Sequence, residues 1–377
     1  MPRLGLGLGL TIGNFLGVSL AQTLANSFQQ RVLADGGTYE ADACLVAYLN
    51  TLINVDLYDS ASLLVTPNGV KSGKIYSVKP TDASGDFTFT RASVATRVNS
   101  VGVVEVVPTG VPSIDYSFGA CPMIISGVQR TNLFLNSAVF VTQNVTTAAV
   151  VYTVSFYGTG TITFSGTFVG SLVGTGANNR VSLTFTATAG TLTSTLTGSA
   201  TNAQLEAGSF ASSCIITTGA TATRVGSMIT QTRTIATNTM FINAALQAGS
   251  LSDGAVYGIL DIRTASNNRI SIYRSNNTIQ LDIINTANLF SGSIFTMPSP
   301  TQGQIYKFAI KITPTTISVF INGVARYTNN SISIPTLTAA TFTLGAFSFG
   351  GQWGSGILPT GEYPTALSDA NCTTLTT

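Results

Sequence analysis

Tyr306-Lys-Phe-Ala-Ile-Lys-Ile312 and Ile317-Ser-Val-Phe-Ile321 lie close together near the C-terminus, and Asn322-Gly323 follows the second stretch directly. β-Branched and aromatic residues dominate both stretches, which is typical of strands that bury at least one face. Asn-Gly is the strongest short-range signal for a β-hairpin. The C-terminal part of the chain is therefore expected to consist of consecutive antiparallel strands.

The same pattern extends through residues 235–377. Asn276-Asn277 marks a second hairpin tip, and Ser368 is expected to cap a short closing helix within Ala366–Cys372. Further strands are predicted at Tyr257–Ile262, Arg269–Tyr273 and Ile279–Ile283.

Residues 131–225 are rich in Thr, Val, Phe and Gly, and glycine-bearing turns separate short alternating runs. Strands repeated at spacings of about ten residues indicate an antiparallel sandwich. The predicted strands are Tyr152–Phe156, Thr161–Phe164, Val181–Phe185 and Leu192–Leu196.

The N-terminal region differs from the rest of the chain. Leu24, Phe28 and Val32 recur at helical spacing, and Asp35-Gly36-Gly37 is expected to end that helix. A second helix is predicted to start near Thr38 as N-cap, which would make a helical hairpin. Such a hairpin is too small to bury both apolar stripes alone, so we expect it to dock on the rest of the chain or on a partner.

Ahead of the helices, Gly5, Gly7 and Gly9 alternate with leucines. This alternation disfavours a helical signal sequence, so export is not expected. No strand precedes it and no βαβ unit follows, so it is not a dinucleotide fingerprint. We interpret it as an extended arm whose leucines pack on a neighbouring surface.

The predicted fold class is mainly β, with the N-terminal arm and helical hairpin followed by two antiparallel β-sandwich (jelly-roll) domains. Residues 1–55 form the arm and hairpin, and 56–130 a β-rich connector with strands at Phe87–Arg91 and Val101–Val107. Residues 131–228 form the first sandwich and 229–377 the second.

Composition excludes several functions. The chain has no histidine, so it cannot hold a Ser-His-Asp relay, a histidine zinc site or an imidazole pH switch. A net charge of +2 and the lack of any basic run predict no nucleic-acid partner. Polar residues interrupt every apolar run before membrane-spanning length, which predicts no membrane partner. Only 8% of residues are charged, so we expect much of the surface to be covered by copies of the same chain.

The four cysteines are far apart and form no CxxC pair. Isolated buried thiols are the expected state, and a disulfide is the open alternative. The cysteines are Cys44, Cys121, Cys214 and Cys372.

Acidic residues give no catalytic or metal pattern. The four glutamates, Glu40, Glu105, Glu206 and Glu362, include no E-x-D-x-E strand, and Glu40 and Asp42 fall in the predicted helical region. We therefore predict no catalytic residue, no cofactor and no metal. Asp253, Asp261 and Asp282 are candidate calcium ligands, but capping of strands or solvent exposure is the simpler interpretation of these residues.

Several segments resemble phage head- and tail-fibre proteins. They are Phe87-Thr-Phe-Thr-Arg-Ala-Ser-Val-Ala-Thr-Arg-Val98, Gln129-Arg130-Thr-Asn-Leu-Phe-Leu-Asn-Ser137, Gln204-Leu-Glu-Ala-Gly-Ser-Phe210 and Thr217-Thr-Gly-Ala-Thr-Ala-Thr-Arg224. In that family, a sandwich resembling a carbohydrate-binding module follows the second segment. The C-terminal region, through Tyr306–Tyr327 and Ala366–Asp369, resembles a concanavalin A-like, laminin-G-type domain.

The resemblance implies a virion structural protein, a head or tail fibre or decoration subunit, assembled in the bacterial cytoplasm. It would be a non-enzymatic homotrimer that is anchored to capsid or tail proteins through residues 1–55 and binds host-surface glycans. The alternatives are a secreted bacterial glycan-binding or adhesion protein and a polysaccharide depolymerase.

A glycan site would combine an aromatic platform with hydrogen-bonding groups. Trp353, the single tryptophan, lies between glycines in Gly350–Gly356 and is the first candidate. The simpler interpretation is that it caps the sandwich edge or fills an interface. Weaker candidates are Tyr257, Tyr273, Arg274 and Asn276.

Overall fold

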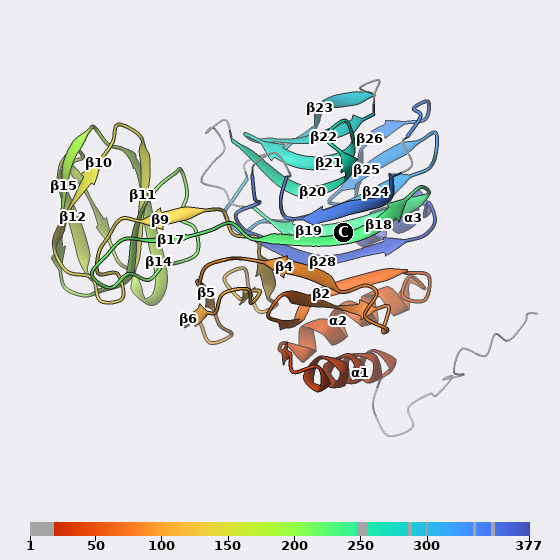
Figure 1. Cartoon of the computed structure of the whole chain (residues 1–377), viewed down its shortest axis with the longest axis horizontal. Helices are drawn as coiled ribbons and strands as arrows, with labels where there is room; N and C mark the ends of the chain where they lie inside the picture. The colour runs from red at the N-terminus through yellow and green to blue at the C-terminus, as the bar shows by residue number, and fades with distance from the viewer. Residues whose placement is uncertain (1–18, 247–254, 286–288, 299, 335–336, 348–350) are drawn as a thin grey trace, which may run out of the picture.

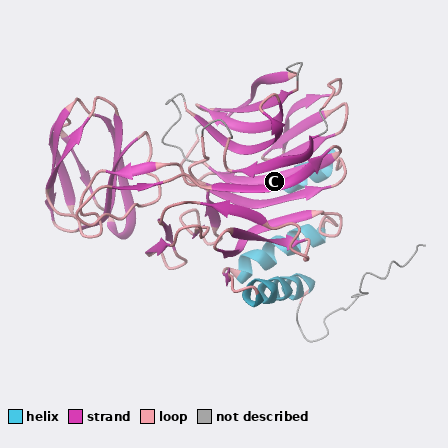
Figure 2. Cartoon of the chain, viewed as in Figure 1, coloured by secondary structure: helices cyan, strands magenta, loops and turns pink. Residues whose placement is uncertain are grey.

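The computed structural model describes residues 19–246, 255–285, 289–298, 300–334, 337–347 and 351–377. The chain is mainly β, as predicted, with two packed bodies of strands and helices on one side of the larger body (Figures 1 and 2). Within the described ranges, no helix has both the length and the apolarity needed to cross a bilayer.

The N-terminal helices form as expected, with one difference at the second start. α1 (Leu20–Ala34) begins after Ser19, whose hydroxyl accepts from the backbone N–H of Gln22 at 3.2 Å, and it ends before Gly36 at φ 71°. α2 (Asp42–Asn54) starts after Ala41, so Thr38 is not its N-cap. Thr38 lies instead in β1 (Thr38–Tyr39), because its backbone pairs with the long strand β2. The closing helix α3 (Asp369–Thr376) begins at Ser368, as predicted.

The larger body, here called the large sandwich, is built from strands of two separate parts of the chain. From the N-terminal part come β1, β2 (Leu63–Lys71), β3 (Lys74–Lys79), β4 (Phe87–Thr90), β7 (Ile114–Asp115) and β8 (Met123–Ile125). From the C-terminal part come β18 (Met228–Ile235), β19 (Asn238–Ala245), β20 (Val256–Ala265), β21 (Asn268–Ser275), β22 (Thr278–Ile284), β23 (Phe290–Thr296), β24 (Ile305–Ile312), β25 (Ile317–Ile321), β26 (Val324–Asn329), β27 (Leu337–Leu344) and β28 (Gly356–Tyr363).

These strands form one ribbon of antiparallel pairs that folds back on itself. One layer runs β23-β22-β21-β20-β27-β18-β4, the other runs β28-β19-β24-β25-β26, and β3 and β2 join the two. A single apolar core, with Ile262 and Ile272 from one layer and Phe308 and Ile310 from the other, fills the space between the layers. All five strands predicted within 235–377 lie in this ribbon.

The connector expected at 56–130 is therefore structurally part of the large sandwich. β2 pairs with β28 across most of the sequence, from Leu63 opposite Glu362 to Val65 opposite Thr360. Only β5 (Ala95–Val98) and β6 (Val104–Val107) form a hairpin outside the ribbon. The sequence pattern predicted β4 and β6 in this region but not β2, and it carried no information about which distant strands pair with one another.

The helices cover the outer face of the second layer. Val32 and Phe28 of α1 pack against β2 at Gly69, where a Cβ atom would lie 2.6 Å from the nearest carbon of Val32. Leu49 of α2 joins the same apolar cluster as Phe241 of the sheet. The helical hairpin thus docks on its own chain.

Residues 131–224 form the smaller body, here called the small sandwich, as an insertion between β8 and β18 (Figure 1). Its core includes Phe134, Phe140, Phe156 and Phe164. One sheet is β10 (Gln143–Thr147), β15 (Gly190–Thr197), β12 (Thr161–Gly166) and β13 (Gly170–Val173), and the other is β14 (Gly176–Thr186), β11 (Val151–Gly158) and β16 (Ala200–Ala207). The four strands predicted here are all confirmed.

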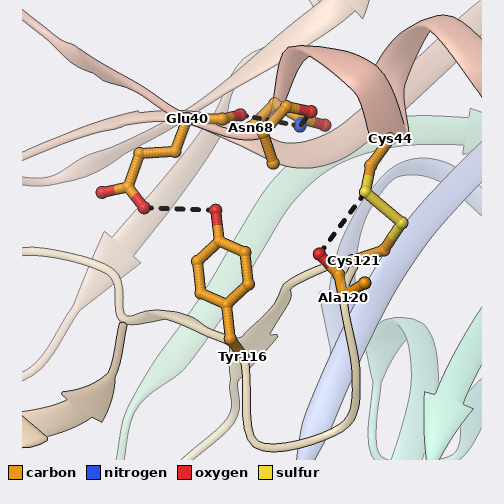
Figure 3. The surroundings of a disulfide bond; sticks show 7 residues. Glu40, Cys44, Asn68, Tyr116, Ala120 and Cys121 are labelled. Carbon is orange, nitrogen blue, oxygen red and sulfur yellow. Dashed lines mark hydrogen bonds between the residues drawn. A yellow bond between two sulfur atoms is a disulfide. The ribbon is translucent and has the colours of Figure 1, made fainter. Parts of the chain in front are cut away.

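One expectation about the cysteines was wrong. Cys44 of α2 and Cys121, in the loop between β7 and β8, form a disulfide with their Cα atoms 5.6 Å apart (Figure 3). The two residues are 77 positions apart in the chain, so only the docking of α2 beside that loop brings them together. Cys214 and Cys372 are free and buried, as predicted.

Candidate functional site

Two short strands join the small sandwich to the large one. β9 (Arg130–Asn132) and β17 (Ala222–Arg224) pair antiparallel, with Arg130 opposite Arg224 (Figure 1). The Arg224 side chain is 2% exposed and donates to the carbonyls of Ser213 at 2.6 Å and Val128 at 3.0 Å. A buried guanidinium needs several acceptors, and here backbone carbonyls from both sides of the joint provide them.

Asn132 is the most completely bonded side chain at this joint. Its amide nitrogen donates to the carbonyls of Ala203 and Ile215, and its carbonyl oxygen accepts from the backbone N–H groups of Phe134 and Leu205. The side chain has no exposed surface. Asn132 therefore ties β9 to β16 and to the chain beyond it.

The β5–β6 hairpin is attached to the same joint. The Thr96 hydroxyl donates to the carbonyl of Cys214 at 2.6 Å, and the Ser93 hydroxyl accepts from the backbone N–H of Val225 at 3.0 Å. The Arg91 guanidinium donates to the carbonyl of Pro108 at 2.8 Å, which holds the base of the hairpin. The hairpin is thereby fixed against the small sandwich.

A cavity of about 840 Å³ opens where the hairpin, the small sandwich and the large sandwich meet. Its wall combines apolar side chains with hydroxyl and amide side chains, and three aromatic rings are among them. The hydroxyl and amide side chains are those of Thr96, Ser117, Asn178, Asn179, Ser182, Thr184, Ser209, Ser213, Gln302 and Ser355, and the aromatic ones are those of Phe118, Tyr157 and Phe210. Pockets of this size, with apolar surface and a few fixed polar groups, are typical ligand sites.

Three charged side chains also line this junction cavity. Asp115 is buried and accepts from the backbone N–H groups of Val98 and Ser117, both at 2.8 Å. Arg97 forms ion pairs with Glu40 at 2.6 Å and Glu105 at 3.0 Å.

The third charged side chain is Arg180 of β14. It donates to the Ser212 carbonyl and the Ser155 hydroxyl. Among the residues that the structure describes, Arg180 has no carboxylate within ion-pair distance.

Two titratable side chains on the wall of the junction cavity have raised pKa values. Burial raises the pKa of the Cys214 thiol and raises the pKa of the Tyr157 phenol to about 12, so both stay protonated near neutral pH. Each of the four glutamates of the chain forms an ion pair with an arginine: Glu40 and Glu105 with Arg97, Glu206 with Arg130, and Glu362 with Arg233. None of these four glutamates lines the junction cavity.

Three of the residues predicted to bind a glycan lie close together, but they are buried in the core of the large sandwich. Trp353 is 1% exposed, and its indole N–H donates to the carbonyl of Ala245 at 2.7 Å. Tyr257 and Arg274 lie opposite each other on β20 and β21, and the guanidinium lies 4.5 Å from the tyrosine ring centre and 6.0 Å from the tryptophan ring. A buried cluster offers no open ring face to a sugar, so the expected platform at Trp353 is corrected to a core residue.

The other two predicted residues lie apart from that cluster. Tyr273 is half-buried, and its hydroxyl donates to Asp282 at 3.1 Å. Asn276 is exposed at the β21–β22 hairpin tip with φ 50°, as the turn prediction required. The structure places neither residue at the junction cavity, and their role in glycan binding stays a prediction.

The carboxylates weighed for calcium have protein partners. Asp261 is fully buried, accepts from the Ser271 hydroxyl and lies 3.7 Å from Arg263, while Asp282 pairs with Arg269 at 2.7 Å. Asp253 lies outside the described residues. Over the described part of the chain, no group of His, Cys, Asp and Glu side chains has the arrangement of a metal site.

The junction cavity was not predicted from the sequence, although some of the residues that build its surroundings lie in segments that stand out in the sequence. Thr96 and Arg224 lie in the very segments that resemble phage fibre proteins, and both of them bond across the joint. Arg91 and Asn132, in the same segments, hold the base of the β5–β6 hairpin and the start of the small sandwich. Those segments had been interpreted only as family markers. The structure shows that they build the connection beside which the cavity forms.

No protein-family model matches the chain, and no curated protein matches it. Among solved structures, the carbohydrate-binding module CBM40 of Ruminococcus gnavus intramolecular trans-sialidase, bound to α2,3-sialyllactose, is similar with 18% identity and a TM-score of 0.29, over 38% of this chain and 84% of that one. Domain 4 of the Geobacillus stearothermophilus arabinanase AbnA, in complex with arabinotriose, is similar with 17% identity and a TM-score of 0.33, over 42% and 77%. A heptameric SAP-like pentraxin of Limulus polyphemus is similar with 16% identity and a TM-score of 0.28, over 38% and 71%.

Proposed function

We propose that the protein is a non-enzymatic structural subunit of a phage particle that binds a glycan in the junction cavity. The observation that carries the binding role is the cavity itself, where hydroxyl and amide groups surround Phe118 and Tyr157. Sugars are bound by such a combination, since their hydroxyls need hydrogen-bond partners and their C–H faces pack on aromatic rings.

The particle role rests on the segments that resemble head- and tail-fibre proteins. Exposed apolar side chains on the β5–β6 hairpin support burial against other subunits: Val94 is 59% exposed, Val101 72% and Val106 63%. A two-stranded hairpin is marginal alone, so contact with a second copy would stabilise it. The proposed homotrimer and the anchoring of residues 1–55 to capsid or tail proteins belong to the same proposal.

Cavity filling tests the binding role. Ser182 and Thr186 are both exposed on β14 and point to the same side, but only Ser182 lines the cavity. For a glycan identified on an array with the wild-type protein, Ser182→Trp is expected to weaken binding at least about tenfold, because the indole occupies the cavity. Thr186→Trp is the matched control and should bind as the wild type does, as measured by calorimetry. Equal affinities of both variants would contradict the assignment of this cavity.

Electron microscopy of intact particles, with the protein located by a bound antibody, tests the particle role. We expect the protein at symmetric positions on the head or tail. The isolated protein should be an oligomer in light scattering, and Val101→Lys combined with Val106→Lys should shift it toward the monomer, because buried lysine at the contact is unfavourable. A monomer that is absent from particles would contradict the particle role.

One observation favours the secreted alternative. The Cys44–Cys121 disulfide is typical of proteins outside a reducing cytosol, which include secreted proteins and virion surfaces. Recovery of the protein from the culture medium of uninfected bacteria would favour the secreted adhesion protein over the particle subunit.

A further inference from the structure

A second cavity, separate from the junction cavity, lies beside the disulfide. It measures about 310 Å³ and is lined mainly by apolar side chains of α2, the loop ending at β8, and the ends of β24 and β28. We call it the α2 groove, and its apolar walls include Cys44, Ala47, Met123, Ile305 and Leu358. Ile305 is 42% exposed, so part of this apolar wall faces solvent in the described residues.

The N-terminal segment has the composition to fill such a groove. Leu4, Leu6, Leu8 and Leu10 alternate with glycine. In an extended chain, side chains two positions apart point the same way, so an extended conformation would gather the four leucines on one apolar edge. The glycines on the other edge carry no side chain that would hinder close approach.

The segment also joins the rest of the chain close to the α2 groove. It precedes Ser19, the N-cap of α1, and the first turn of α1 touches the first turn of α2 through the amide of Gln22, which donates to Asp42 at 2.8 Å. Cys44, on the wall of the groove, follows Asp42 by two residues, and Figure 3 shows it joined to Cys121. The eight residues between Leu10 and Ser19 span up to about 28 Å when extended.

We infer that the α2 groove binds the leucine edge of residues 4–10 of the same chain. A tether of a few residues holds that edge near the groove at a high effective concentration, which favours the chain's own arm over the arm of a second copy. The groove would then be an interaction surface that the arm covers, independent of glycan binding in the junction cavity.

Cross-linking in the full-length protein tests this inference. Gly7→Cys is combined with Ala47→Cys in the groove or with Ala34→Cys, a similarly exposed alanine on α1 outside the groove. A short bismaleimide reacts with thiols and leaves the Cys44–Cys121 disulfide intact, while Cys214 and Cys372 are buried. We expect an intrachain product with Ala47→Cys at a yield about fivefold or more above that with Ala34→Cys.

Replacing Leu4, Leu6, Leu8 and Leu10 by Ser in the Gly7→Cys, Ala47→Cys protein should reduce the yield to that of the Ala34→Cys control. Equal yields at the two positions, or a yield that survives the serine substitutions, would overturn the inference. A cross-link between chains, visible as a dimer on a denaturing gel, would overturn it in favour of arm exchange between copies. Glycan binding is measured separately, so its failure leaves this result unaffected.

Discussion

Asn132→Ala is expected to destabilise the small sandwich by about 3–5 kcal/mol, because the substitution leaves four buried backbone groups without their partner. The carbonyls of Ala203 and Ile215 lose a donor, and the N–H groups of Phe134 and Leu205 lose an acceptor. Water cannot replace the lost amide readily, since the Asn132 side chain is fully buried. Urea unfolding followed by tyrosine fluorescence, to which Tyr152 and Tyr157 of the small sandwich contribute, and by circular dichroism measures the loss.

Asn144→Ala is the matched control for this variant. Asn144 is an exposed residue on β10 of the same body, so its removal should change the free energy of unfolding by less than about 0.5 kcal/mol. A similar small change for Asn132→Ala would show that the joint does not depend on this amide.

Removing the disulfide is expected to cost about 4 kcal/mol of stability, the value for a cross-link that closes a loop of this length. The loop between Cys44 and Cys121 spans 77 positions and contains β2, β3 and β4, which join the two layers of the large sandwich. Without the cross-link, the unfolded chain gains conformational freedom that the folded chain does not. Thermal unfolding of the wild type with and without reductant provides a first measurement.

A double-mutant cycle separates the disulfide from local packing. Cys44→Ser, Cys121→Ser and the double variant should all lose nearly the same stability, because either single substitution already breaks the bond. Additive losses would mean that the two cysteines contribute independently, and would contradict a formed disulfide. Reductant should leave the double variant unchanged.

Local sequence patterns predicted the elements of this protein well. Period-two alternation located β11, β12, β14 and β15, and the Asn322-Gly323 hairpin tip lies between β25 and β26 as expected. Helical spacing of Leu24, Phe28 and Val32 located α1 together with its end at Gly36. These features depend on residues within about ten positions of one another, so a single stretch of sequence contains the information needed.

The predicted glycan site required that the side chain of Trp353 be exposed to solvent, and no local sequence pattern determines solvent exposure. Trp353 lies between glycines, which suggested a loop, yet the fold packs it with Tyr257 and Arg274 in the core. The strands that bury Trp353 are β19, β20 and β21, which are distant from it in sequence. The adjoining Gly354 and Ser355 line the junction cavity.

The sequence by itself determined the mainly β class, the positions of the most regular strands and of α1, and the exclusion of imidazole chemistry, because composition and short-range periodicity are local properties. Only the tertiary structure decided that β2 pairs with β28, that Cys44 meets Cys121, and that a cavity forms beside Arg180 and Tyr157. Each of these pairings joins residues separated by tens to hundreds of positions. They follow from the burial of apolar faces over the whole chain, which no single segment of sequence contains.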